Sequence, residues 1–165
     1  MVGYSTAEII RVTSLREQPE LLPTMITFFQ AHWGTPESNP VYADCLAHSV
    51  HPHTALPQWY LAFIPDAQIV GGAGLIPNDF ISRMDLFPWL CALFVLPEFR
   101  RQGVAQQLIH RASQDAQQAG FDHLYAATDL TDFYERQEFH YIGDGYQPWG
   151  DQLRIYERPL TTRAE

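Results

Sequence analysis

The stretch Phe99–Leu108, FRRQGVAQQL, lies between an apolar run and a helical pattern, and it decides how this chain folds. Residues 86–96 before it are apolar enough to form a central strand that is covered on both faces. Residues 102–119 after it place small and apolar side chains at helical spacing, and Gly120 is a favourable helix stop. We therefore expect a strand, a turn around Gly103 and a helix.

The next apolar segment, residues 122–128 (DHLYAAT), predicts a second strand. Two strands joined by a helical crossover run parallel to each other. In such arrangements a ligand binds beyond the carboxyl end of the first strand, near the N-terminus of the crossover helix. The sequence therefore predicts a binding site at the turn around Gly103.

The chemistry of this turn favours an anion. The first turn of a helix has N–H groups without intrahelical acceptors, and its dipole end is positive. Gly103 lets a ligand approach the backbone closely, the small side chain of Ala105 keeps the groove open, and Arg100 and Arg101 add positive charge. We expect a phosphate or pyrophosphate group here.

The rest of the chain predicts a mixed α/β domain that covers residues 1–165. Ahead of the turn we expect a strand over residues 7–15, helices over 18–34 and 39–51, and a β-hairpin over 58–76 that turns at 64–68. Beyond residue 128 we expect a short helix over 131–137 and strands over 139–146 and 152–160.

Composition excludes several classes of function. The 165 residues carry a net charge of -9, and the basic residues are scattered except at Arg100 and Arg101, which argues against nucleic-acid binding. The sequence has no stretch of about 18 apolar residues, so we expect no membrane span. Two cysteines without CxxC spacing favour reduced thiols in the cytoplasm. The acidic balance favours cationic ligands.

Three segments resemble the GNAT superfamily of N-acetyltransferases, in a bacterial-type form. Residues 93–109, LFVLPEFRRQGVAQQLI, are similar to its motif A, here Arg100-x-x-Gly103-x-Ala105. Residues 128–139, TDLTDFYERQEF, resemble its FYxxxGF signature, with Glu138 in place of the usual glycine. The hairpin end IVGGAGLI is also of the family's kind. The resemblance implies a mixed, mostly antiparallel twisted sheet of about seven strands, with a splayed parallel pair in the middle and about four helices.

The resemblance also implies a cosubstrate and a reaction. Acetyl-CoA would bind with its pantetheine arm along the backbone of Leu93, Phe94 and Val95. Its pyrophosphate would lie at Arg100 and on the amides of residues 101–106, which are Arg101, Gln102, Gly103, Val104, Ala105 and Gln106. The acetyl group would pass to a cationic primary amine of a small molecule or peptide by direct attack on the thioester. A noncatalytic acyl-CoA-binding or interaction domain is the alternative, and the family also allows a homodimer.

Two side chains are the main catalytic candidates. Tyr134 stands where the family carries the tyrosine that protonates the departing thiolate. Asp85, ahead of the central strand, is a candidate general base, and Asp79 and Asp129 remain open for the same role. Trp89 occupies the position where some members carry a catalytic glutamate, so that base is not inherited.

A histidine cluster raises the question of a metal. His48, His51 and His53 fall within six residues, which is a pattern that zinc could use. Pro52 interrupts the helix that would align them, and no cysteine or carboxylate stands at suitable spacing. We predict no metal site, and we expect the N-terminal helices and the loop PNDFISRMD to shape the acceptor site instead.

Overall fold

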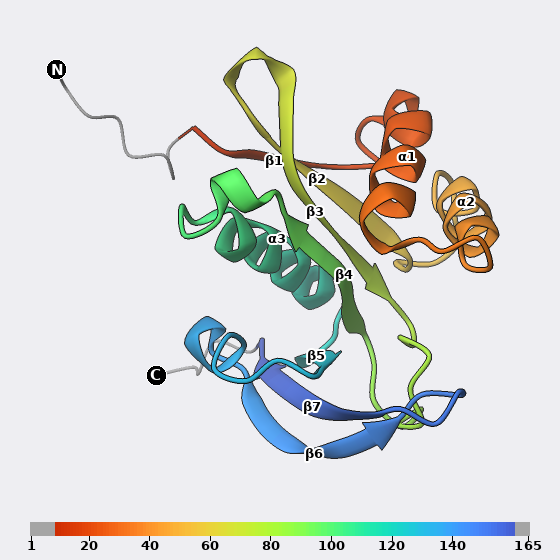
Figure 1. Ribbon diagram of the computed structural model, residues 1–165, viewed down its shortest axis with the longest axis vertical. Coiled ribbons are helices and arrows are strands. Elements are labelled where there is room, and N and C mark those ends of the chain that lie inside the picture. Colours follow the sequence, from red (N-terminus) through yellow and green to blue (C-terminus); the bar gives the residue numbers. More distant parts are fainter. Residues whose placement is uncertain (1–8, 161–165) are drawn as a thin grey trace, which may run out of the picture. The chain divides into compact units, whose positions relative to one another are not determined.

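A computed structural model describes residues 9–160, which form a seven-stranded sheet and its helices (Figure 1). The strands are β1 (Arg11–Ser14), β2 (Gln58–Ile64), β3 (Gln68–Ile76), β4 (Trp89–Val95), β5 (His123–Thr128), β6 (His140–Tyr146) and β7 (Gln152–Pro159). The α-helices are α1 (Leu22–Trp33), α2 (Asn39–Ala47) and α3 (Val104–Gln118). Short 3-10 turns are η2 (Pro19–Leu21), η3 (Pro65–Ala67), η4 (Pro97–Phe99) and η5 (Glu135–Gln137). Each predicted strand is present; residues 7 and 8 of the first lie outside the described range.

The sheet is mixed and mostly antiparallel, as expected. Its strand order is β1-β2-β3-β4-β5-β7-β6. β4 and β5 are parallel, with Trp89 opposite Tyr125, and the Tyr125 amide donates to the Pro88 carbonyl at 3.0 Å. β5 pairs with β7, and β7 with β6, in antiparallel fashion. The helical crossover predicted after Gly103 is α3, which confirms the strand, turn and helix order.

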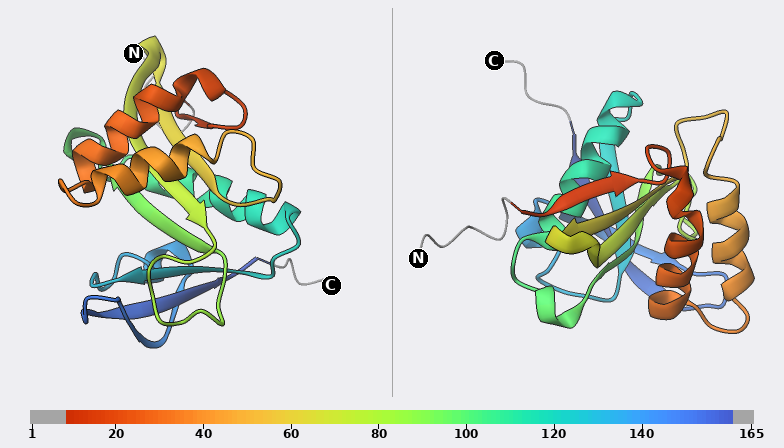
Figure 2. Two further views of the ribbon diagram at one scale, coloured as in Figure 1. Left: turned by 90° about the vertical axis from the view of Figure 1, so that its right-hand side faces the viewer. Right: turned by 90° about the horizontal axis from the view of Figure 1, so that it is seen from above.

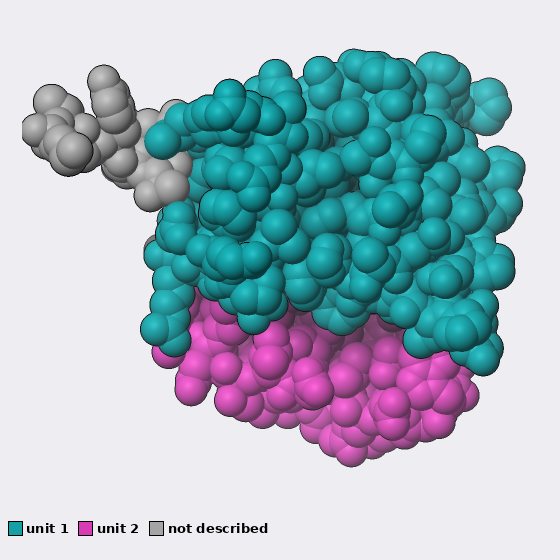
Figure 3. Space-filling model, turned by 45° about the horizontal axis from the view of Figure 1, so that its top comes forward, with its two compact units in different colours: residues 1–74, 92–108 teal, residues 75–91, 109–165 magenta. Residues whose placement is uncertain are grey.

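The chain divides into two compact units, which Figure 3 colours separately. Unit 1 contains the residues up to Gly74 together with Ala92–Leu108. Unit 2 contains Leu75–Cys91 and the residues from Ile109 onward. The predicted cosubstrate-binding residues therefore fall in unit 1, whereas Tyr134 and Asp85 fall in unit 2.

Two adjacent glycines of β3 explain how unit 1 is layered. Neighbouring residues of a strand face opposite sides of the sheet. A Cβ at Gly71 would meet Val104 and Leu108 of α3, whereas a Cβ at Gly72 would meet Phe28 and Phe29 of α1. The helices α1 and the start of α3 therefore cover opposite faces of β3, and both approach closely because the glycines have no side chains. The helix α2 lies beside α1 (Figures 1 and 2).

Unit 2 has its own core. Ala112 and Ala116 are buried on α3, and the strands bury Leu124 and Ile155. Arg158 of β7 donates to the Ser113 hydroxyl of α3, which joins the helix to the strands of this unit.

The number of α-helices differs from the expectation of about four. Residues 9–160 form three α-helices, and the short helix predicted over residues 131–137 is only the 3-10 turn η5. Asp132 has a φ of 69° and Glu138 a φ of 66°, so neither residue has helical backbone. Between these two left-handed residues the chain forms only the single 3-10 turn Glu135–Gln137.

Among residues 9–160, none of the helices is both long enough and apolar enough to cross a lipid bilayer.

Candidate active site

The predicted anion site is a turn followed by a helix N-terminus. The turn η4 leads into residues 100–103, and α3 begins at Val104. Gly103 has a φ of 86°, a conformation that favours glycine. Its carbonyl accepts the Gln107 amide at 3.0 Å, which is the first hydrogen bond of the helix. The amides of Val104, Ala105 and Gln106 precede that bond and so have no intrahelical acceptor.

The two arginines of this turn have different surroundings. Arg100 donates its Nε to the Val95 carbonyl at 3.0 Å, and its guanidinium carbon lies 5.4 Å from the centre of the Phe94 ring. Arg101 is exposed and has a left-handed φ of 61°. Arg100 therefore ties the turn to the end of β4, while the charge of Arg101 is available to a ligand in solvent.

The C-terminal end of α1 contacts the part of β4 that precedes this turn. Ala92 has a φ of 50°, which interrupts the extended backbone of the strand. The Trp33 indole donates to the Ala92 carbonyl at 3.0 Å. His32 stacks on Phe94 with 4.1 Å between ring centroids. The sequence gives no signal for these contacts, because nothing in the spacing links residues 32 and 33 to β4.

Tyr134 lies in unit 2, immediately before η5. Its ring is buried and contacts Phe139 edge-on and Tyr156 in a stacked arrangement. Its carbonyl accepts the amides of Gln137 and Phe139, at 3.0 and 3.1 Å, so the backbone around it is held on its C-terminal side. Burial raises the pKa of the Tyr134 hydroxyl above its usual value, and the nearby Asp79 carboxylate raises it further. Tyr134 is therefore protonated throughout the neutral range.

Asp79, whose charge raises the pKa of Tyr134, is itself a titratable group of unit 2. It sits in the loop between β3 and β4, where Asn78 accepts the Ile81 amide at 3.1 Å and donates to the Ile81 carbonyl at 3.0 Å. These two hydrogen bonds close a turn that contains Asp79, and they fix its backbone. Desolvation by burial raises the pKa of Asp79 to about 7. A carboxyl group with that pKa can both accept and release a proton near neutrality.

The loop that carries Asp79 is also fastened to β6. The Ser82 amide donates to the Tyr146 carbonyl and the Tyr146 amide donates to the Ser82 hydroxyl, both at 2.9 Å. The loop that contains Asp79 is therefore held by the hydrogen bonds of Asn78 with Ile81 and by those of Ser82 with Tyr146.

Asp85 has a different environment from Asp79. It forms a two-point ion pair with Arg83, with distances of 2.9 and 3.0 Å, and its side chain is 62% exposed. The hydrogen bond from Arg83 lowers the pKa of Asp85. A carboxylate with a lowered pKa binds protons less readily, so Asp85 is the weaker base of the two. Asp129, the third candidate base, is exposed.

Trp89 is a core residue. It is fully buried, donates its indole N–H to the Leu86 carbonyl at 2.7 Å and packs against Tyr125. This position provides no acid or base.

The histidine segment holds no metal cluster. His48 lies 3.4 Å from Asp44, and both side chains are largely exposed. Within the described part of the chain, no group of three or more His, Cys, Asp or Glu side chains is arranged to hold a metal ion.

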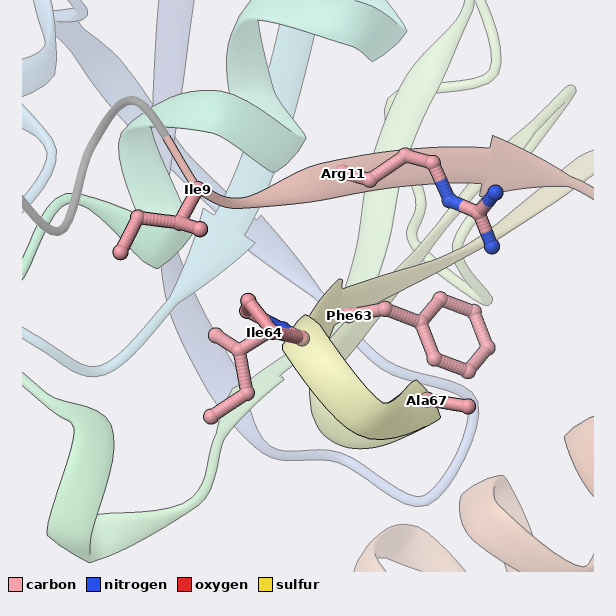
Figure 4. Close-up of a pocket in the computed structure, with 6 residues that line it drawn as sticks. Ile9, Arg11, Phe63, Ile64 and Ala67 are labelled. Carbon is pink, nitrogen blue, oxygen red and sulfur yellow. The ribbon is translucent and has the colours of Figure 1, made fainter.

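A pocket of about 260 Å³ lies in unit 1 at the β2–β3 turn (Figure 4). Among the residues that line the pocket, Arg11 is the one that carries a charge, and its guanidinium carbon lies 5.7 Å from the centre of the Phe63 ring. The remaining lining residues are apolar, namely Ile9, Ile64, Pro65 and Ala67. None of these residues belongs to the predicted site.

The sequence of residues 20–139 matches the family model described as the acetyltransferase (GNAT) family. The chain belongs to the GNAT acetyltransferase family. The matched residues include the Gly103 turn and Tyr134. No curated protein sequence matches the chain.

Solved structures share the GNAT fold at low sequence identity. A GNAT-family acetyltransferase from Desulfovibrio desulfuricans has a TM-score of 0.69 and 19% identity over 92% of this chain and 99% of its own. An aminoglycoside 6'-N-acetyltransferase complexed with coenzyme A has a TM-score of 0.69 and 15% identity over 94% and 99% of the two chains. The ribosomal-protein-S18-alanine N-acetyltransferase from Escherichia coli has a TM-score of 0.65 and 15% identity over 95% and 97%.

Proposed function

We propose that this protein is an acetyl-CoA-dependent N-acetyltransferase that acts on the primary amine of a small molecule or peptide. The observation that carries the proposal is the pair Tyr134 and Asp79 in unit 2. One is a buried phenol that keeps its proton, and the other is a carboxyl group with a pKa of about 7. Acyl transfer to an amine requires a proton donor and a proton acceptor of this kind.

The turn in unit 1 suits the cosubstrate. In this proposal the amides of residues 101–106 bind the pyrophosphate, because the helix N-terminus supplies unpaired N–H groups and positive potential. Arg101 adds screened attraction at the rim. In this proposal the backbone of Leu93, Phe94 and Val95 pairs with the pantetheine arm, and a strand amide near Leu93 polarises the thioester carbonyl.

The proposed reaction is a direct transfer. Asp79 removes a proton from the ammonium group of the acceptor, and the neutral amine forms a bond to the carbonyl carbon of the thioester. The C–S bond then breaks, and the departing thiolate of CoA takes the hydroxyl proton of Tyr134. The nitrogen, which carries two protons after the attack, loses one of them to solvent, and the product amide keeps the other. Water then returns a proton to Tyr134, and Asp79 releases its proton to solvent. Asp85 stays a prediction for the base, and its ion pair with Arg83 makes it the weaker candidate.

Charge supports a cationic acceptor. The chain carries a net charge of -9, which favours the approach of an ammonium group. The similar structures are named for two different acceptors, an aminoglycoside amine and the alanine of a ribosomal protein. Both names describe amines, and they define the range of acceptors that a first screen should contain.

The alternative function is a noncatalytic acyl-CoA-binding or interaction domain. The buried Trp89 at the position of the family glutamate favours this reading. The two functions differ in turnover. Purified protein should be incubated with acetyl-CoA and a panel of small amines and peptides, with free CoA measured by chromatography and acetylated product by mass spectrometry. Amine-dependent CoA release with matching product supports the enzyme, whereas CoA binding without release on every amine supports the alternative.

A further inference from the structure

The strand β7 holds the segment that carries Tyr134 at two separate points. The first point is the hydroxyl of Tyr156. This hydroxyl donates to the Glu135 carboxylate at 2.7 Å and accepts the Nε–H of Arg154 at 3.0 Å. Glu135 is the first residue of η5 and directly follows Tyr134. Tyr156 therefore links the strand to the residue beside the proposed acid.

The same side chain forms one wall around the Tyr134 ring. The two rings stack with 5.6 Å between centroids and 27° between planes. Tyr156 is fully buried, so its ring has little freedom to move. Glu135 and Arg154 hold the hydroxyl, which is the far end of the Tyr156 side chain. The ring face of Tyr156 that stacks on Tyr134 therefore has a defined position.

The second point is Arg158, two residues further along β7. Its Nε donates to the Gln137 carbonyl, and one terminal nitrogen pairs with the Glu138 carboxylate, both at 3.1 Å. The other terminal nitrogen bonds the Ser113 hydroxyl of α3. These bonds hold the end of η5 where the backbone becomes left-handed at Glu138, which is the position of the usual family glycine.

We propose that Tyr156 is a positioning residue for Tyr134. Its hydroxyl, held between Glu135 and Arg154, fixes the stacked ring and the start of η5, and thereby sets the direction of the Tyr134 hydroxyl. Proton transfer requires donor and acceptor within hydrogen-bond reach, so a small displacement of the donor lowers the rate without altering cosubstrate binding. This inference rests on the proposed role of Tyr134 as the general acid.

The test is Tyr156→Phe, which keeps the stacked ring and removes only the hydroxyl. We expect kcat to fall by about tenfold, the loss that corresponds to roughly one hydrogen bond of positioning. The Kd for CoA, measured by calorimetry, should change less than about twofold, because no predicted CoA-binding residue is touched. The matched control is Tyr141→Phe, since that exposed hydroxyl of β6 bonds Asp144 instead of Glu135. The control should leave kcat within about twofold of native.

A double-mutant cycle distinguishes positioning from a general structural effect. If Tyr156 acts through the Tyr134 hydroxyl, adding Tyr156→Phe to Tyr134→Phe should lower kcat no further. A full tenfold loss in that background would overturn the inference, and so would a native kcat for Tyr156→Phe when Tyr134→Phe is slow. A native rate for Tyr134→Phe itself would instead contradict the proposed acid, which is a separate failure.

Discussion

Arg158 forms an ion pair with Glu138, with 3.1 Å between the guanidinium nitrogen and the carboxylate oxygen. Glu138 has a φ of 66°, although it is not a glycine. A left-handed conformation costs a residue with a Cβ roughly 1–2 kcal/mol. Arg158 therefore stabilises a backbone conformation that the GNAT signature normally assigns to glycine.

Replacing Glu138 separates these two effects. Glu138→Ala loses the ion pair and retains the backbone strain, whereas Glu138→Gly loses the ion pair and removes the strain. We expect Glu138→Gly to be more stable than Glu138→Ala by about 1 kcal/mol. Denaturant titration of both variants measures this difference in the free energy of unfolding. Equal stabilities would mean that the turn relaxes when the carboxylate is removed.

Gly103 should be essential for cosubstrate binding. Gly103→Val places a branched side chain beside the amides proposed to bind the pyrophosphate, and it also strains a backbone with a φ of 86°. We expect CoA binding to be lost, and the smaller Gly103→Ala to retain more of it. Calorimetry measures the affinity, and circular dichroism checks that both variants are folded. Native CoA affinity in folded Gly103→Val would remove the phosphate site from this turn.

Arg101 should contribute modestly and in a salt-dependent way. Arg101→Ala removes an exposed charge, whereas the helix amides remain, so we expect CoA affinity to fall by about three- to tenfold at low salt and less at high salt. Arg136→Ala is the matched control, because Arg136 is also exposed but lies in η5. A loss as large as that of Gly103→Val would reverse the proposed order of importance.

Tyr134 should affect catalysis and leave binding intact. Tyr134→Phe keeps the aromatic packing and removes the proton donor, so we expect kcat to fall by roughly 10²–10⁴ with CoA affinity almost unchanged. Steady-state kinetics on an amine identified in the screen measures the effect. Native turnover would show that water or another group supplies the proton.

Asp79 should set the pH dependence. If Asp79 accepts the proton, kcat/KM rises as pH increases through about 7, and Asp79→Asn removes this inflection. Asp85→Asn is the control and should keep it, because Arg83 lowers the pKa of that carboxyl. The pH–rate profiles of the three proteins provide the comparison. An inflection that persists in Asp79→Asn and disappears in Asp85→Asn would exchange the two roles.

Stability gives an independent readout of the same group. The folded pKa of Asp79 lies above the unfolded value of about 4, so between about pH 4 and 7 the folded state binds a proton that the unfolded state has released. The free energy of unfolding therefore falls as pH rises through this window. Asp79→Asn should make the fall shallower, which thermal unfolding at several pH values would show.

Local patterns were sufficient for the order of the strands and for the turn around Gly103. The apolar run ahead of Arg100, the glycine at residue 103 and the helical spacing after it all act over a few residues, and the structure has a strand, a turn and α3 there. The motif around Gly103 and the segment with Tyr134 also sufficed to indicate the GNAT family, which the family model confirms.

Tertiary structure decided which titratable groups lie together and how the η5 turn is held. Sequence alone leaves both Asp79 and Asp85 as candidate bases. In the structure, burial raises the pKa of Asp79, whereas the hydrogen bond from Arg83 lowers the pKa of Asp85. The fourth helix fails because Asp132 and Glu138 adopt left-handed backbone, and Arg158, which is distant in sequence, helps to hold Glu138 there. Desolvation and long-range hydrogen bonds depend on which strands become neighbours, and the spacing of residues along the chain does not determine which strands pair.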